Sequence, residues 1–211
     1  MIGEHIESEA KFLTPGRLLP SVKAYMESLG FRVEDQETEE QQDIYWDTPQ
    51  RTLFKTGAAL RLRYVGGKCV AAVKRAGSSD KGVISRPEVE WPVDDLAGAV
   101  LRRRRTWSLP LPSEARLPAS VDQTTLVRVL TLYTVRQKSI VSNTEGFRAE
   151  LVFDNVLFRA KQRQRRHKEL ELELKSGKPG EIEYLADSLR RRFDLTPSVT
   201  SKYSLGMDLV G

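Results

Sequence analysis

The stretch Glu169-Leu170-Glu171-Leu172-Glu173-Leu174-Lys175 alternates strictly between charged residues and leucine. A period of two is typical of a β-strand, in which successive side chains point to opposite faces of the sheet. One face of this predicted strand is therefore apolar, and the other carries three carboxylates in a row. Neighbouring like charges repel each other, so the charged face needs cations from elsewhere in the molecule or from a ligand.

Other segments with a β period also place like charges on one face. Some of these faces are acidic and some are basic. The pairs are Glu7 and Glu9, Arg61 and Arg63, Glu88 and Glu90, Arg136 and Lys138, and Glu150 and Asp154. If these strands close into a barrel with their charged faces inward, opposing carboxylates and cations line the interior, and the leucine faces pack outward beneath helices.

Helices are expected between these strands. Apolar residues at three- and four-residue spacing predict amphipathic helices over 18–29, with Gly30 as a C-terminal cap, and over 181–193. A helix over 94–105 and a short helix over 124–129 are also expected, with loops at 76–82 and 108–120. Besides the strand with Glu7, strands are predicted at 42–46, 58–65, 69–75, 84–93, 132–141, 147–157 and 167–175. About eight strands, mostly joined by turns, with inserted helices indicate an α+β fold.

Composition excludes several classes of protein. Of the 211 residues, 39% are hydrophobic and 30% are charged, which is enough apolar material for a core. A single cysteine, Cys69, and two histidines rule out an internal disulfide, a thiolate zinc site and a histidine-rich metal centre. With no apolar run near ~18 residues and no secretory signal, a cytoplasmic protein without a membrane partner is expected.

The charged faces suggest the chemistry of a ligand. Buried charge is costly unless it is paired, so a lumen lined by both signs needs a ligand that satisfies both. Carboxylates bind hard divalent cations through oxygen, whereas Arg and Lys bind phosphate oxygens. A phosphate chain accompanied by Mg²⁺ or Mn²⁺ fits, and the net charge of +5 allows an anionic ligand.

An ordered set of motifs resembles the CYTH superfamily, the triphosphate tunnel metalloenzymes. Glu7-Ser8-Glu9-Ala10-Lys11 resembles the family's ExExK pentapeptide, and Leu60-Arg61-Leu62-Arg63 resembles its LRxR strand. The segments that follow in the family's order, within a match over 4–205, are 43–49, Lys74, 86–90, Arg136, 150–154, 169–175 and 201–203. The resemblance implies a closed eight-stranded antiparallel β-barrel with flanking helices, formed by a single domain over 1–211.

The resemblance also implies roles for individual residues. Glu7, Glu9 and Lys11 are the expected catalytic residues. The expected phosphate-binding residues are Lys11, Arg61, Arg63, Lys74, Arg86, Arg136, Lys138 and Lys202. The expected ligands of Mg²⁺ or Mn²⁺ are Glu7, Glu9, Asp154, Glu171 and Glu173, with Glu88, Glu90, Glu150 and Glu169 assisting through water or neighbouring contacts.

The activity implied is hydrolysis of a phosphoanhydride bond, with inorganic tripolyphosphate as the favoured substrate. Thiamine triphosphate is the second candidate, and Trp46 could stack on its thiazole ring or on a base, or else pack at a turn. Class IV adenylyl cyclase activity ranks lower, because the six residues before Glu7 lack the His-Phe pair of those enzymes. A non-catalytic polyphosphate-binding tunnel is a further alternative, but a pure anion binder gains nothing from the acidic strands.

Other residues have simpler expected roles. The basic runs 102–105 and 163–168 could form a nucleic-acid surface, but the acidic strands would repel a nucleic-acid backbone, so a nucleic-acid partner is not expected. The expected partner is a small triphosphate, bound by a monomer or homodimer. Cys69 is expected in the core, and His5 and His167 are expected to face solvent.

Overall fold

The computed structural model describes residues 3–14 and 18–210, in which eleven β-strands form one sheet. Eight strands form a barrel, and each pairs antiparallel with its neighbours in the order β1-β10-β9-β8-β3-β4-β5-β7. Pairing of β7 with β1 closes the barrel. Its strands are β1 (Glu4–Leu13), β3 (Glu39–Asp47), β4 (Ala59–Val65), β5 (Lys68–Lys74), β7 (Val83–Val93), β8 (Val127–Ser142), β9 (Arg148–Ala160) and β10 (Arg163–Ser176).

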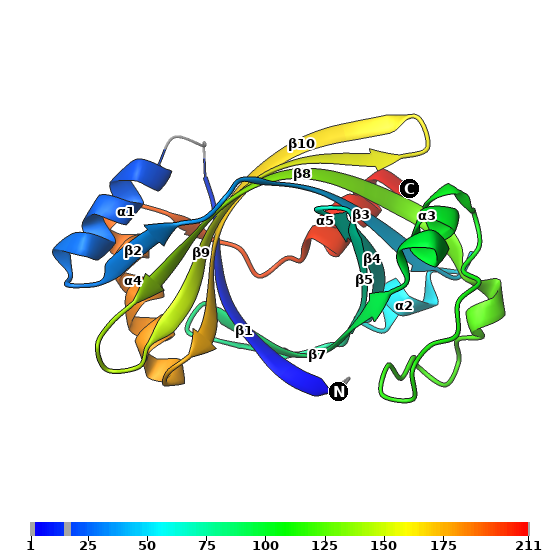
Figure 1. The fold of residues 1–211 in the computed structure, drawn as a ribbon, viewed down its shortest axis with the longest axis horizontal. Helices are drawn as coiled ribbons and strands as arrows, with labels where there is room; N and C mark the ends of the chain where they lie inside the picture. The colour runs from blue at the N-terminus through cyan, green and yellow to red at the C-terminus, as the bar shows by residue number, and fades with distance from the viewer. Residues whose placement is uncertain (1–2, 15–17, 211) are drawn as a thin grey trace.

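Figure 1 shows this barrel end on. The strand pairings confirm the predicted closed eight-stranded antiparallel barrel. Three short strands extend the sheet outside the barrel: β2 (Arg32–Asp35) on β8, β6 (Ser78–Asp80) on β7, and β11 (Thr196–Pro197) on β1. None of the three was expected, and β6 lies inside the predicted loop 76–82. Segments of two to four residues are too short to show a β period, so only tertiary pairing defines them.

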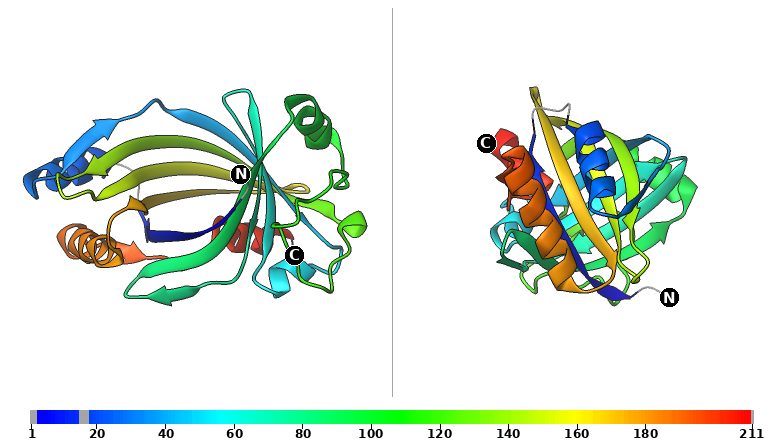
Figure 2. Two further views of the ribbon diagram at one scale, coloured as in Figure 1. Left: turned by 60° about the horizontal axis from the view of Figure 1, so that its bottom comes forward. Right: turned by 90° about the vertical axis from the view of Figure 1, so that its left-hand side faces the viewer.

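Two of the helices cover one outer side of the barrel. α1 (Leu19–Ser28) and α4 (Pro179–Phe193) pack on the outer faces of β1, β8, β9 and β10 (Figure 2). Leu170 and Leu172 are buried in this layer, which confirms that the leucine face of β10 points outward. α4 spans the predicted helix 181–193 and begins two residues earlier, at Pro179, which is suited to a first helical turn.

A second outer layer covers β3, β4, β5 and β7. It contains α3 (Asp95–Arg103) and the chain up to Leu126, packed around Trp46 and Trp107. The side chain of Asp94 caps α3 by accepting hydrogen bonds from the backbone N–H groups of Leu96 and Ala97. The predicted short helix over 124–129 is wrong. A three-residue 3₁₀ helix, η1 (Gln123–Thr125), stands there, and β8 already begins at Val127.

The last helix, α5 (Lys202–Val210), packs on the inside of the barrel, although no helix was expected there. Leu130 and Leu132 contact it from β8, on the strand face that also carries Arg136. The apolar residues of α5 include Tyr203, Leu205, Met207 and Leu209 at alternate positions, so they do not form a single apolar stripe, and the buried face contains Lys202 and Gly206 beside Tyr203 and Met207. The surrounding barrel, and not an amphipathic pattern, therefore positions this helix.

The remaining helix, α2 (Thr52–Lys55), follows β3. No helix in the described part of the chain has both the length and the apolar character needed to cross a bilayer.

Candidate active site

Strand register brings the charged faces together inside the barrel. On β1, Glu9 lies directly opposite Glu173 of β10, which in turn lies opposite Glu150 of β9. Two residues further along β1, Lys11 lies opposite Glu171. Glu9, Glu173 and Glu150 thus form a row of three carboxylates on neighbouring strands. Like charges side by side repel each other, so this register is favourable only with cations nearby.

These side chains line a cavity of about 340 Å³. Among the described residues, eight carboxylates and nine lysines or arginines line it. The lining includes every residue with a predicted site role except Asp154 and Glu169, which are completely buried. Asp154 contacts Arg136 and Lys202 of the lining, and Glu169 contacts Lys202.

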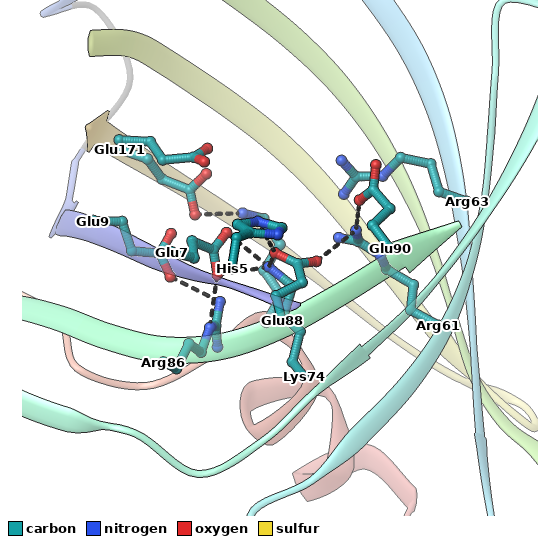
Figure 3. A network of polar contacts seen from close by, with 12 residues as sticks. His5, Glu7, Glu9, Arg61, Arg63, Lys74, Arg86, Glu88, Glu90 and Glu171 are labelled. Atoms are coloured by element: carbon teal, nitrogen blue, oxygen red, sulfur yellow. Dashed lines mark hydrogen bonds and ion pairs between the residues drawn. The ribbon is translucent and has the colours of Figure 1, made fainter. Parts of the chain in front are cut away.

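The first group of contacts centres on β1. Glu7 accepts hydrogen bonds from Lys74 at 2.7 Å and from Arg86 at 2.8 Å. Arg86 also donates to Glu9 Oε1 at 2.7 Å (Figure 3). The ammonium of Lys11 lies 2.9 Å from the same oxygen. Burial alone would raise the pKa of Glu7, but Lys74 and Arg86 hold it well below its usual range. Glu7 is therefore ionised at neutral pH.

The second group centres on Lys202, at the start of α5. Its ammonium lies 2.9 Å from Asp154 and 2.8 Å from Glu171, and it also contacts Glu169. One oxygen from each of these three buried carboxylates lies within 4.8 Å of the others, which is a spacing that could hold a metal ion. Burial lowers the pKa of Lys202, but the three carboxylates raise it well above its usual value.

Arg136 completes this second group. It donates two hydrogen bonds to Asp154, at 2.9 and 2.6 Å, and one to Glu171 at 3.1 Å. Glu169 was expected to play only an assisting role, but it stands inside this cluster, whereas Glu7, Glu9 and Glu173 stand outside it. The five predicted metal ligands thus divide between this cluster and the β1 side of the cavity.

A third group lies on β3, β4 and β8. Arg63 donates two hydrogen bonds of 2.8 Å to Asp43, and Lys138 donates one of 3.0 Å to Glu39. Burial would raise the pKa of Asp43, but Arg63 holds it well below its usual range. Asp43 and Glu39 were not among the predicted site residues. The alternation of Glu39, Gln41, Asp43 and Tyr45 along β3 was the signal that could have identified them.

The aromatic side chains at β3 separate into an inner and an outer one. Tyr45 lines the cavity and stacks on Tyr203 of α5, with ring centroids 4.9 Å apart. Trp46 points outward and is fully buried against Trp107. Trp46 therefore packs in the outer core and cannot stack on a ligand inside the barrel, because adjacent residues of a strand point to opposite faces.

The two histidines and the cysteine are also placed. His5 is exposed, as expected, and its Nε2 lies 3.8 Å from Glu88. His167 does not face solvent, because its Nε2 lies 2.9 Å from the buried Glu169 and 14% of its side chain is exposed. Cys69 is buried in the outer core, as expected.

The donor chemistry of the cavity fits Mg²⁺ or Mn²⁺. Both ions prefer oxygen ligands, and the acidic side chains supply only carboxylate oxygens. Among the described residues, buried Glu88 Oε1 and buried Arg61 Nε have no hydrogen-bond partner. Glu88 Oε1 lies 3.6 Å from the guanidinium of Arg61, beyond hydrogen-bond distance. An acceptor and a donor that lack hydrogen bonds in one cavity match a ligand that brings both cations and anionic oxygens.

The sequence comparisons agree with this geometry. The family model of the CYTH domain matches residues 5–202. The chain therefore belongs to the CYTH domain family. No curated protein matches the sequence.

Solved structures share the fold at low sequence identity. HpAC1 from Hippeastrum, a proposed adenylyl cyclase with a dominant triphosphatase activity, is 19% identical with a TM-score of 0.59 over 96% of this chain and 95% of that one. A proposed adenylate cyclase from Bacillus halodurans is 18% identical with a TM-score of 0.64 over 95% and 96%. The PH1819 protein from Pyrococcus horikoshii OT3 is 19% identical with a TM-score of 0.57 over 96% and 99%.

Proposed function

We propose that this protein is a metal-dependent hydrolase of triphosphate phosphoanhydride bonds, and that its substrate is inorganic tripolyphosphate. One observation carries the proposal. In the cavity inside the barrel, the basic side chains that would hold phosphate are paired with the carboxylates that would hold metal ions. Lys74 with Glu7, Arg86 with Glu9, and Arg136 with Asp154 are examples.

Charge balance explains why metal ions and phosphate would bind together. The nine cations of the lining are nearly matched by its eight carboxylates. A highly charged triphosphate entering alone would have to compete with these carboxylates for every cation. Divalent cations on the carboxylates release the lysines and arginines to the phosphate oxygens, so each ligand removes the cost of binding the other.

The lining also supports an inorganic substrate. Of the described residues around the cavity, the two aromatic ones, Tyr45 and Tyr203, stack on each other. Neither ring is free to sandwich a thiazole or an adenine ring. Most other lining residues are charged, which suits a ligand that carries charge along its whole length. Tripolyphosphate fits this description better than thiamine triphosphate or ATP.

The proposed roles of the side chains follow from their positions. Lys11, Lys74 and Arg86 converge from β1, β5 and β7 and would orient one end of the phosphate chain. Arg61 and Arg63 on β4 would neutralise the other end. Glu7, Glu9, Asp154, Glu171 and Glu173 would hold Mg²⁺ or Mn²⁺, which supplies polarisation of phosphate oxygens and activation of water. Most of the rate enhancement would come from this fixed arrangement of charge.

Phosphate release from tripolyphosphate, thiamine triphosphate and ATP, measured with Mg²⁺, Mn²⁺ or EDTA, tests the proposal. We expect metal-dependent turnover with a strong preference for tripolyphosphate. Preference for thiamine triphosphate would overturn the substrate assignment and leave the hydrolase assignment intact. Tight binding of all three without release, measured by calorimetry, would show a binding tunnel and overturn the hydrolase assignment.

A further inference from the structure

The outer face of the barrel carries a row of side chains that faces away from the cavity. Strand register places Arg166 of β10, Leu157 of β9, Tyr133 of β8, Gln42 of β3 and Tyr64 of β4 directly side by side. These five residues, here called the outer row, line a groove of about 400 Å³ on the surface. The groove is separate from the inner cavity, because the outer row alternates with inward-facing residues along each strand.

This part of the sheet lies between the two covered layers of the barrel. Along β9 and β10, the outer face on one side of the row is buried beneath α1 and α4. Along β3 and β4, the outer face on the other side of the row is buried beneath α3 and the segment that follows it. In the row between them, Tyr133 is 40% exposed, and the neighbouring Val135 is 43% exposed. An aromatic and apolar strip on an open sheet face is typical of a binding surface.

One residue of each basic run lines this groove, Arg102 from the run 102–105 and Arg166 from the run 163–168. Arg102, at the end of α3, lies over the ring of Tyr64 at 4.1 Å, and Arg159, near the β9–β10 turn, lies over the ring of Tyr133 at 5.0 Å. The segments 102–105 and 159–168 together contain ten lysines or arginines and no aspartate or glutamate. Among the described residues that line the groove, Glu40 is the one carboxylate.

We propose that the outer row binds single-stranded nucleic acid. Unpaired bases stack on tyrosine rings and on guanidinium planes, and the phosphates of the same strand bind arginine and lysine. Tyr64 and Tyr133 are separated by β3, so they would each take a different base of an extended strand. Arg102 on one side, and Arg166 and Lys168 on the other, would hold the backbone.

The acidic strands do not oppose this binding. From sequence, their carboxylates were expected to repel a nucleic-acid backbone. In the fold, Glu169, Glu171 and Glu173 point to the inner face of β10, whereas Arg166 and Lys168 point to its outer face. The wall of the barrel therefore separates the acidic side chains from the basic groove. The alternation of residues along each β-strand does not by itself reveal this separation.

Fluorescence anisotropy with a labelled 12-nucleotide oligouridylate tests the proposal. The RNA carries a 5′-hydroxyl, so that it offers no triphosphate to the inner cavity. We expect salt-dependent binding that Arg166→Glu/Lys168→Glu weakens at least 10-fold, with a shallower salt dependence because two phosphate contacts are lost. Tyr133→Ala should weaken binding about 10-fold through the loss of one stacked base.

The control is Lys55→Glu/Arg148→Glu, which makes the same charge change at exposed residues of α2 and the start of β9. It should reduce RNA affinity by less than 3-fold, and both double variants should keep wild-type hydrolysis of tripolyphosphate. An equal loss in the control would show non-specific attraction and overturn the proposal. Absence of measurable RNA binding would also overturn the proposal. So would displacement of the RNA by tripolyphosphate together with wild-type RNA affinity of the Arg166→Glu/Lys168→Glu variant, because the RNA would then bind in the inner cavity. Competition by single-stranded DNA would support the proposal as much as binding of RNA.

Discussion

Glu9 and Lys11 show at the scale of single residues how the site combines opposite charges. Both are almost completely buried, and they pair with each other. Each also pairs with a residue of one other strand, Glu9 with Arg86 of β7 and Lys11 with Glu171 of β10. Burial lowers the pKa of Lys11, but Glu9 and Glu171 raise it above its usual value, so the ammonium stays charged. Buried charges that are fully paired can act on a ligand without first being desolvated.

We expect Glu9→Gln to lower tripolyphosphate hydrolysis at least ~100-fold, the loss typical for removal of one charged group that acts on the transition state. Lys11→Ala should have an effect of the same size. Steady-state phosphate release measures both variants, and circular dichroism checks their fold. Glu4→Gln makes the same change at an exposed position of β1 and should keep full activity. Wild-type turnover in both folded site variants would exclude the proposed site.

Asp43 governs stability at acidic pH. Its pKa is lowered in the folded protein by Arg63, against an unfolded value of about 3.9. The pair therefore contributes full stability above that value, and the contribution is lost as the pH falls toward the folded pKa. We expect Asp43→Asn to lower the free energy of unfolding by about 3 kcal/mol at pH 7, the usual cost of breaking a buried ion pair.

Urea unfolding between pH 7 and pH 3 measures this effect. The difference between the wild type and Asp43→Asn should shrink below pH 4, because Asp43 of the unfolded wild type takes up a proton there while the folded protein keeps the carboxylate ionised. A constant difference in the free energy of unfolding across this range would show that the pairing of Asp43 with Arg63 does not cause the loss of stability at acidic pH. Asp80→Asn, at an exposed residue of β6, should leave the curve unchanged.

At the scale of elements, β1 supplies charged residues to the site and also closes the barrel. Three alternate residues of β1 face inward, and the strand pairs with both β7 and β10 to close the barrel. Phe12 and Ala10 face the opposite way, into the core beneath α4. The strand therefore joins the outer core to the inner charge network, and its register determines which carboxylates meet.

The contact of α3 with β5 depends on a glycine. A Cβ added to Gly98 would lie 2.3 Å from Cys69 Sγ and 2.6 Å from its Cβ. We expect Gly98→Ala to lower the free energy of unfolding by about 1 to 3 kcal/mol through overpacking. Thermal or urea unfolding measures the change. Gly180→Ala is the matched control, since nothing lies within 4 Å of its added Cβ.

A double variant tests the cause of this effect. Cys69→Ala should partly restore the stability of Gly98→Ala, because it removes the sulfur atom that the new methyl group meets. If the two substitutions are simply additive, the close approach of α3 to Cys69 is not the source of the loss.

At the scale of the whole molecule, the barrel holds two nearly equal sets of opposite charge around one cavity. A ligand that binds one set of side chains takes them away from their ion-pair partners and leaves the charges of the other set uncompensated. Metal ions and triphosphate should therefore bind with strong positive coupling. We expect the affinity for imidotriphosphate, whose P–N–P bridges resist hydrolysis, to fall at least 10-fold when EDTA replaces Mg²⁺.

Titration calorimetry measures this coupling in both directions. Because linkage is reciprocal, imidotriphosphate should raise the affinity for Mg²⁺ by the same factor. Equal affinity for imidotriphosphate with Mg²⁺ and with EDTA would contradict the exchange of partners inside the cavity. The outer row should not contribute, so Arg166→Glu/Lys168→Glu should show the same coupling as the wild type.

The strands and their two faces follow from local patterns in the sequence. Alternation in 169–175 and in Glu7-Ser8-Glu9-Ala10-Lys11 follows from the two-residue period of a strand, and it correctly separated the charged side chains from the leucines. The ordered motifs also predicted the closed barrel and the family, both of which are confirmed. These features are local in the chain or belong to one strand at a time, so a single sequence contains them.

Which charges meet depends on the three-dimensional arrangement of the strands and of α5. Register places Glu9 beside Glu173, and the inward packing of α5 inserts Lys202 among Asp154, Glu169 and Glu171. Neither follows from a period, because both depend on how strands far apart in the chain are aligned and on where the barrel leaves room for a helix. The same holds for Tyr64 and Tyr133 on the outer face, which are distant in sequence and meet only through Gln42 of the strand between them.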